Sequence, residues 1–225
     1  MGEKLGGAAI PLDPAPRETM QDHVYRKVRD LILSGEIAPG RSITIKSLSD
    51  AFAVSHMPVR EALHRLAAER ALTVVSGRSM GIPPLSVARL ADLRRVRSEM
   101  EGMAAAWAAE RIDAAGLAQL TLLNAKLDKA VEENDVKAYL HANRDFHFAV
   151  YAAAGSPTLL SMIESLWLQI SPYFNLLHAS GNYVESNAHH RALTEALHRR
   201  DPEAARRALQ GDIDAAASVL DSLLG

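Results

Sequence analysis

The chain has 225 residues, of which 48% are hydrophobic, 23% charged and 5% aromatic. This balance is typical of a soluble globular protein, and the abundance of alanine and leucine favours helices packed on helices over a β-sandwich. The absence of cysteine excludes disulfides, thiolate zinc sites and cysteine nucleophiles. No stretch approaches the ~20 apolar residues that span a bilayer. We therefore expect a cytoplasmic protein without a membrane partner, in which the Gly- and Pro-containing residues 1–18 form a flexible tail.

The net charge of −2 conceals a difference between two parts of the chain. Residues 1–85 hold 11 Lys or Arg against 9 Asp or Glu, whereas residues 86–225 hold 14 against 18. The difference has the sign expected if the first part binds nucleic acid, but it is too small to decide the matter alone.

The first part of the chain predicts three helices. In residues 19–34, apolar side chains recur at helical spacing, and Gly35 is placed to end the helix. These apolar residues are Val24, Val28, Leu31 and Ile32. A turn at Pro39-Gly40 leads to a second helix capped by Thr44. The side chains expected to point inward from that helix are Leu48, Ala51 and Phe52.

The third predicted helix is capped by Ser55 and runs to about Arg70, with Pro58 in its first turn. Residues 72–75 are then short and β-branched, 76–79 are typical of a turn, and 80–82 return as a second strand. Three helices followed by a small hairpin predict a winged helix-turn-helix at residues 19–84. Pro83-Pro84 marks its expected boundary.

Residues 85–225 predict an all-α bundle with its own core. The expected helices lie near 87–110, 114–133, 136–154, 157–178, 184–199 and 202–223. Residues that can cap or precede these helices are Asp113, Asp135, Ser156 and Asp201. One inward stripe comprises Leu117, Leu120, Leu127 and Val131. The whole chain is therefore expected to be mainly α, with a small β-hairpin in its first part.

The segment from Ser55 to Leu66 has the residues that a helix in the major groove needs. Arg60 can bond guanine or a phosphate, His56 can donate or accept, and Ser55 can contact a phosphate. Met57 lies in the same turn. Residues suited to flanking contacts are Lys46 at the start of the second helix, for the DNA backbone, and Arg78 at the wing tip, for a phosphate or the minor groove. A solvated amphipathic helix with a few arginines explains the same spacing about as well.

The sequence of this region resembles the DNA-binding domain of the GntR family of bacterial regulators. The resemblance rests on GEIAPG, on LSDAFAVSHMPVREALHRLAAERAL and on the hairpin with Gly81. It implies that the DNA-facing residues are Lys46, Ser55, His56, Met57, Arg60, Gly77 and Arg78. The family most often has Arg where this chain has His56, so His56 and Met57 are expected to set the chain's own operator preference.

The second part contains residues that can bind a metal ion. Asn143 and His147 are four residues apart and share a helical face, while His189-His190 and Asp212 follow on later helices. Oxygen and imidazole ligands suit Zn, Ni or Mn. An Asn/His pair at this spacing is more often a simple hydrogen-bonding pair.

The segments NRDFHFAVYAAAGSPTLLSMIESLW and HHRALTEALHRRDPEAARRAL resemble the FCD domain, the effector-sensing domain of the FadR subfamily. Many such domains hold a metal with one Asp and three His. The resemblance places the ligands at Asn143, His147, His190 and Asp212, so that Asn and Asp replace the Asp and one His of the pattern. Spacing to Asp212 favours His190 over His189.

Arg97, four residues before Glu101, matches an arginine that lines the effector cavity in this family. A guanidinium beside a metal suits a carboxylate ligand. The alternative is a surface pair between Arg97 and Glu101 that contributes little.

Together these features predict a homodimeric regulator, expected to act as a repressor on a palindromic operator and to respond to a small organic acid. The alternatives are a metal-dependent hydrolase built on the helical part, and a helical scaffold without ligand. The hydrolase would lack an obvious general base beside its ligands and would leave the first part unexplained.

Overall fold

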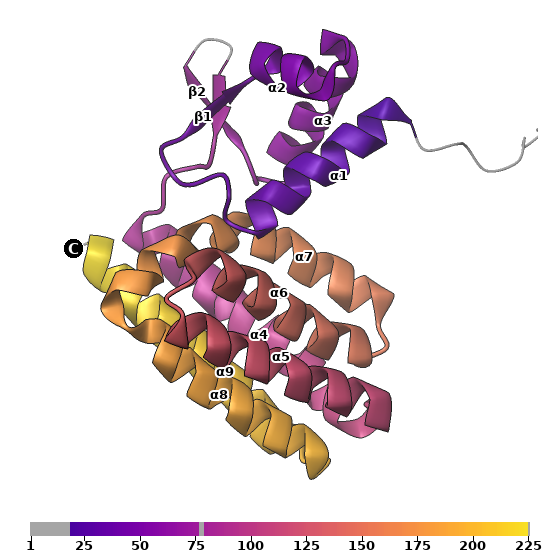
Figure 1. Ribbon diagram of the computed structural model, residues 1–225, viewed down its shortest axis with the longest axis vertical. Helices are drawn as coiled ribbons and strands as arrows, with labels where there is room; N and C mark the ends of the chain where they lie inside the picture. Colours follow the sequence, from indigo (N-terminus) through magenta and orange to yellow (C-terminus); the bar gives the residue numbers. More distant parts are fainter. Residues whose placement is uncertain (1–18, 77–78, 225) are drawn as a thin grey trace, which may run out of the picture.

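The computed structural model describes residues 19–76 and 79–224, and it has a small head above a helical bundle (Figure 1). The predicted tail at residues 1–18 and the predicted wing residues Gly77 and Arg78 lie outside the described residues. The fold is mainly α, as predicted.

The head consists of helices α1 (Met20–Leu33), α2 (Ile45–Phe52) and α3 (His56–Ala68) with three short strands. The apolar side chains of α1 and α3 face one another and form its core. The most deeply buried of them are Val24, Val28, Ile32, Val59, Leu63 and Leu66. The predicted helices are confirmed for α1 and α3, and the predicted inward face is confirmed for α1, because 3.6-residue periodicity places these side chains on one stripe.

Within the described chain the strands form one antiparallel sheet in the order β1-β3-β2. The predicted hairpin is β2 (Thr73–Ser76) with β3 (Ser79–Gly81), and the added strand β1 (Ser42–Thr44) was not predicted. Ile43 of β1 lies opposite Met80 of β3, and both side chains are buried. A three-residue strand is too short for periodicity to reveal.

Helix caps in the head follow the predictions with one exception. The Thr44 hydroxyl accepts from the Ser47 amide and forms a capping box at the start of α2. At α3, however, among the described residues no cap hydrogen bond is made by the Ser55 side chain. The cap at Thr44 uses the amide three residues on, and at Ser55 that position is Pro58, which has no N–H. The prediction that Ser55 caps α3 was wrong for this reason.

A second local prediction in α2 was also wrong. Ala51 is exposed, whereas Ser49 is buried, and Leu48 and Phe52 pack against the core as predicted. In a helix of eight residues the inward stripe is narrow, so an error of one position moves a side chain to the other face.

The bundle is built around α4 (Val87–Arg111), which contacts four other helices and packs most extensively on α9 (Pro202–Leu224). The other α-helices are α5 (Ala114–Glu132), α6 (Val136–Ala153), α7 (Pro157–Ile170) and α8 (Asn182–His198). The predicted caps Asp113, Asp135, Ser156 and Asp201 all accept a backbone hydrogen bond. In the part of the chain that is described, no helix is long and apolar enough to cross a membrane.

One predicted helix, residues 157–178, is divided in the structure. Helix α7 ends at Ile170, and residues Ser171–Ser180 form the 3₁₀ helix η1. Pro172 removes an amide and its ring opposes the carbonyl four residues earlier, so the α-helical ladder cannot continue. Gly181 in the left-handed region then ends η1 before α8.

Helix η1 and the end of α1 join the head to the bundle. From η1, Ser171 Oγ donates to the Ile32 carbonyl (3.2 Å), and Asn175 Nδ2 donates to the Gly35 carbonyl (2.8 Å). The Tyr173 hydroxyl donates to the Pro83 carbonyl. Two ion pairs add to the junction, Arg29 with Glu164 and Arg144 with Asp30. Three residues of η1 therefore hold the C-terminal end of α1 and the C-terminal end of the head.

Candidate DNA interface and candidate metal centre

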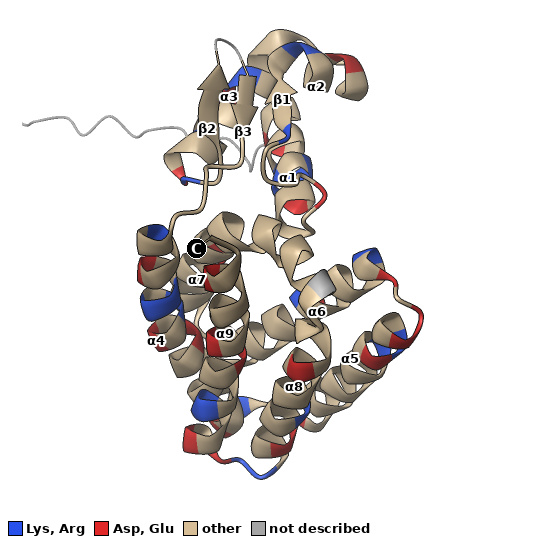
Figure 2. Cartoon of the chain, turned by 90° about the vertical axis from the view of Figure 1, so that its left-hand side faces the viewer, with Lys and Arg blue, Asp and Glu red and all other residues tan. Residues whose placement is uncertain are grey.

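The first two turns of α3 present a polar, solvent-exposed face. Ser55, His56, Met57 and Arg60 are all exposed, and 58% of the Met57 surface is accessible. The opposite face of the same helix is buried in the head core. Figure 2 places α2 and α3 at the end of the molecule farthest from the lower helices of the bundle. This face of α3 is therefore accessible to a partner molecule.

Lys46 lies in the first turn of α2, and its side chain is exposed to solvent. Its Nζ pairs with Asp50 at 2.7 Å, and this hydrogen bond raises the pKa of Lys46 above its ordinary value. Both partners remain open to solvent, so a phosphate can replace Asp50 at little cost. The wing residues Gly77 and Arg78 are not described, and the structure does not place them.

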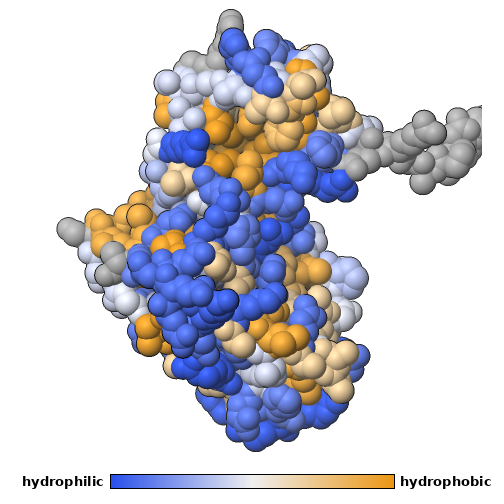
Figure 3. Space-filling view, viewed as in Figure 1, coloured by the Kyte–Doolittle hydropathy of each residue, from blue (hydrophilic) through white to orange (hydrophobic). Residues whose placement is uncertain are grey.

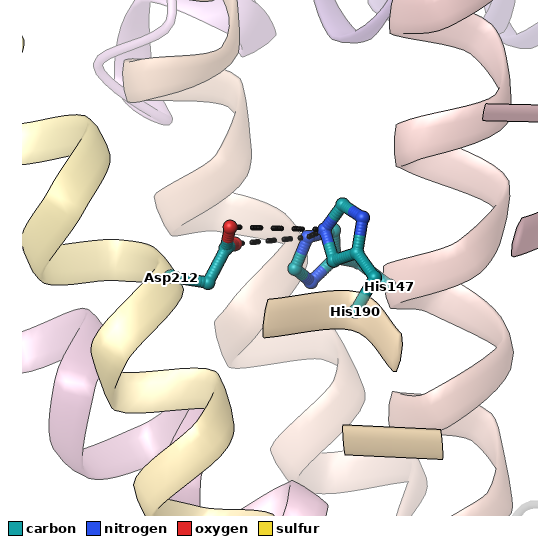
Figure 4. Close-up of side chains that lie close together, drawn as sticks. All are labelled: His147, His190 and Asp212. Atoms are coloured by element: carbon teal, nitrogen blue, oxygen red, sulfur yellow. Dashed lines mark hydrogen bonds and ion pairs between the residues drawn. The ribbon is translucent and has the colours of Figure 1, made fainter. Parts of the chain in front are cut away.

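In the bundle, three buried side chains from three helices converge (Figure 4): His147 of α6, His190 of α8 and Asp212 of α9. The His147 Nε2 lies 3.3 Å from Asp212 Oδ2 and 3.1 Å from His190 Nε2. His190 Nε2 is 3.7 Å from Asp212 Oδ1. This cluster can hold a metal ion, with one ligand atom from each side chain.

The spacing of these atoms fits an ion. Nitrogens bound to one Zn at 2.0–2.1 Å, in tetrahedral or octahedral directions, lie roughly 2.9–3.4 Å apart. The measured 3.1 Å between the two Nε2 atoms falls in that range. Asn143, one helical turn before His147 on α6, lines a small cavity together with His147 and Asp212. Among the described residues the cluster does not include His189, which instead packs beside Gly211.

Burial and charge set the protonation states of the cluster. Burial lowers the pKa of His190, and the Asp212 charge opposes this shift only in part. Burial alone raises the pKa of Asp212, but His190 and His147 outweigh it and hold that pKa well below its ordinary value. A neutral imidazole beside a carboxylate is the donor set that a divalent transition metal requires.

A second layer of buried polar groups lies behind His147. Its Nδ1 is 3.1 Å from the Tyr151 hydroxyl, which donates to Glu101. Glu101 also accepts from Arg97 Nε at 2.6 Å and from Arg97 Nη2 at 3.2 Å. The surface-pair interpretation of Arg97 and Glu101 was therefore wrong, because both side chains are buried. Burial lowers the pKa of Arg97, but the charge of Glu101 outweighs burial and the net shift is upward.

The cavity beside the cluster is small, with a volume of about 20 Å³. Its polar lining comprises Arg97, Tyr139, Asn143, His147, Trp167, Asn182, Tyr183, Ser186 and Asp212. Two donors of this lining, Trp167 Nε1 and Asn182 Nδ2, have no hydrogen-bond partner within residues 19–76 and 79–224. This volume suits one water or one ion. An organic acid requires side chains to move.

Several residues of this site were not singled out from the sequence: Tyr139, Tyr151, Trp167, Asn182, Ser186 and, as a buried partner, Glu101. Three of them stand four residues from a predicted ligand: Tyr139 before Asn143, Tyr151 after His147 and Ser186 before His190. Ser186 Oγ donates to Asp212 Oδ1 at 2.5 Å. Helical spacing was the available signal, since residues four apart share a face.

Two family models match the chain. Residues 20–82 match the model described as "Bacterial regulatory proteins, gntR family", and residues 92–215 match the FCD domain. The two matches coincide with the head and with most of the bundle.

Curated proteins and solved structures agree with these matches. The HTH-type transcriptional regulator McbR of Escherichia coli is 34% identical over 178 residues, which cover 78% of this chain and 80% of McbR. The HTH-type transcriptional repressor GlaR of E. coli is 31% identical over 79% of this chain and 84% of GlaR. The solved structure of E. coli McbR/YncC superposes with a TM-score of 0.84 at 30% identity, covering 93% of this chain and all of that one. These relatives are transcription regulators, which argues against the hydrolase interpretation.

Proposed function

Because this chain belongs to the GntR family of bacterial regulators and carries an FCD domain, we propose that it is a cytoplasmic, homodimeric repressor of a palindromic operator. As a member it is a helix-turn-helix transcription regulator. In the proposal, residues 19–84 bind DNA, and residues 85–225 dimerise and bind a small carboxylate that releases the operator. The observation that carries the proposal is the exposed first two turns of α3, whose other face is fixed in the core.

Each exposed residue has a role suited to its chemistry. Arg60 and His56 are placed to contact base edges, and Met57 offers an apolar contact to a thymine methyl group. Lys46 and Ser55 are assigned to phosphates, together with Gly77 and Arg78 of the wing. Ser55 is available for this role because its hydroxyl is not used as a helix cap.

Titration of a labelled duplex from the DNA flanking the gene tests this role, with salt varied in parallel. Arg60→Ala should weaken specific binding by about 5- to 150-fold, the loss of one good base contact. Arg199→Ala is the matched control, because Arg199 is an exposed arginine at the far end of α8. Equal, weak binding of wild type and both variants to every sequence would refute the regulator proposal.

A palindromic operator requires two heads related by a two-fold axis. Exposed apolar side chains gather where the C-terminal end of α9 meets η1 and β2, and Figure 3 shows hydrophobic residues on this flank. They include Val74, Val75, Leu176, Leu223 and Leu224. This patch supports association of a second copy. Sedimentation equilibrium should give a dimer, and a concentration-independent monomer would contradict it.

We assign a divalent transition metal, Zn, Ni or Mn, to His147, His190 and Asp212, with Asn143 as the fourth ligand. The spacing of the two Nε2 atoms and the convergence of three buried side chains support this assignment. When bound, such an ion supplies a positive charge that can anchor a carboxylate.

Elemental analysis of protein purified without an affinity tag tests the metal. About one equivalent per chain is expected in the wild type, and far less in Asp212→Asn. His189→Gln is the matched control, because His189 adjoins a proposed ligand on α8 but lies outside the cluster. Less than about one-tenth equivalent in the wild type after supplementation would refute the assignment.

The effector is proposed to enter the cavity beside the cluster, where Arg97 and the unpartnered donors of Trp167 and Asn182 favour a carboxylate. Helix η1 links that cavity to the head. Its Phe174 and Leu177 line the cavity, while Asn175 of the same helix holds the head. A ligand that enlarges the 20 Å³ cavity must therefore displace η1 or its neighbours.

Operator release by short mono- and dicarboxylates measures this coupling. At least one should lower operator affinity in the wild type, by the ratio of its affinities for the two states. Asn175→Ala should bind the same acid while operator affinity changes less. Failure of the whole panel to bind metal-loaded protein would contradict the choice of a carboxylate.

A further inference from the structure

The buried chain Arg97–Glu101–Tyr151–His147 has a defined direction of hydrogen bonding. The direction is set at Glu101, which is fully buried and accepts two N–H bonds from Arg97, at 2.6 and 3.2 Å. An arginine side chain only donates, and a carboxylate paired with it only accepts. The third bond of Glu101, from Tyr151, must therefore use the hydroxyl proton of Tyr151.

Because a phenol is protonated at neutral pH, Tyr151 has one hydroxyl proton, which it donates in the hydrogen bond to Glu101. Its oxygen can then only accept from the Nδ1 of His147, 3.1 Å away. We infer that Tyr151 and Glu101 are positioning residues that hold the His147 proton on Nδ1 and leave a lone pair on Nε2.

That lone pair faces Asp212 and His190. His147 Nε2 lies 3.3 Å from a carboxylate oxygen of Asp212 and 3.1 Å from Nε2 of His190. A lone pair facing a carboxylate repels it unless a cation lies between them. The network therefore prepares His147 for an ion and disfavours the bond from Nε2–H to Asp212 that would close the site without one.

His190 provides a contrast within the same cluster. Its Nδ1 is buried and has no hydrogen-bond partner among the described residues. The single hydroxyl proton of Ser186 is donated to Asp212 Oδ1, so at 3.3 Å the Ser186 oxygen can only accept from Nε2–H of His190. The two histidines are thus unequal: His147 already has a lone pair on Nε2, whereas His190 must move its proton to Nδ1 before its Nε2 can bind an ion.

This inference rests on the proposed metal centre for its function, but its first test needs no metal. Full-length protein with ¹⁵N-labelled histidine, stripped of metal and held at mildly alkaline pH, reports the proton position on each ring nitrogen. Comparison with His147→Asn assigns the His147 signals. The wild type should show the Nδ1–H form. An Nε2–H form in the wild type overturns the inference, whatever the variants do.

Tyr151→Phe is the second test. It should move the His147 proton toward Nε2, where it can bond Asp212, and should weaken Ni²⁺ binding by about 10- to 100-fold, as loss of an outer-shell partner does. Tyr25→Phe removes a hydroxyl that also donates to a glutamate, Glu69, but lies in the head outside the cluster, and should change neither result. An unchanged proton position in Tyr151→Phe refutes the role of Tyr151. A wild type with the Nδ1–H form that binds no Ni²⁺ supports the inference and refutes the metal centre.

Discussion

The head and the bundle use polar side chains in opposite ways. The head exposes Arg60, His56 and Lys46 to solvent, where a charge costs little and stays available to a new partner. The bundle buries Arg97, Glu101 and Asp212, where each charge must be compensated by its neighbours. The head is thus suited to strong, salt-dependent contact with a polyanion, and the bundle to selective contact with a small ligand.

The largest effect should come from Glu101→Ala. It leaves the Arg97 charge buried without its partner, which typically lowers the free energy of unfolding by about 3–5 kcal/mol. Asp50→Ala removes the exposed partner of Lys46 and should leave that free energy unchanged within error. Urea unfolding of both variants measures the difference. Equal effects would mean that the buried pair has no special role.

A smaller effect is expected at the junction, from Gly35→Ala. Gly35 has a φ of +70°, and an added Cβ would lie 2.7 Å from Asn175 Nδ2. The backbone strain alone costs about 1–2 kcal/mol. Gly40→Ala is the matched control, because Gly40 has a φ of +81° and nothing within 4 Å of the added atom. Thermal unfolding should show the larger loss for Gly35→Ala; equal losses would deny the importance of the Asn175 contact.

The caps of α2 and α3 allow a comparison within the head. Thr44→Ala removes a capping box and should lower the free energy of unfolding by about 0.5–2 kcal/mol. Ser55→Ala removes no cap bond and should leave stability unchanged while it weakens DNA binding. Urea unfolding and duplex titration of both variants separate the two effects. A stability loss in Ser55→Ala as large as in Thr44→Ala would contradict the assignment of Ser55 to DNA.

The smallest effect concerns alkaline pH. Burial and the hydrogen bond to Glu69 raise the pKa of Tyr25 from 10.0 to about 12. Because the folded pKa is the higher one, the contribution of neutral Tyr25 is present below pH 10 and is lost as pH rises through 12. Tyr25→Phe should flatten the decline of thermal stability over this window. An identical decline in the variant would refute the contribution.

Sequence patterns predicted most helices, their caps and the location of both candidate sites. Periodicity is strong in long amphipathic helices, and side chains four residues apart share a face. Sequence patterns failed where a local effect determined the structure. They missed that Pro58 has no amide for a cap at α3, that Pro172 ends α7, and that the three residues of β1 form a strand. They also could not tell that Arg97 is buried, because burial depends on which helices pack over it.

The pairing of β1 with β3 has a consequence for the operator. It ties the segment that enters α2 to the second strand of the wing, while α2 leads directly into α3. The β2–β3 hairpin and α3 are therefore joined through β1 and α2, so in the proposed complex the protein sets the distance between their contacts on a half-site. We expect that inserting one base pair within a half-site abolishes specific binding, because the two contacts would then lie farther apart on the DNA than on the protein.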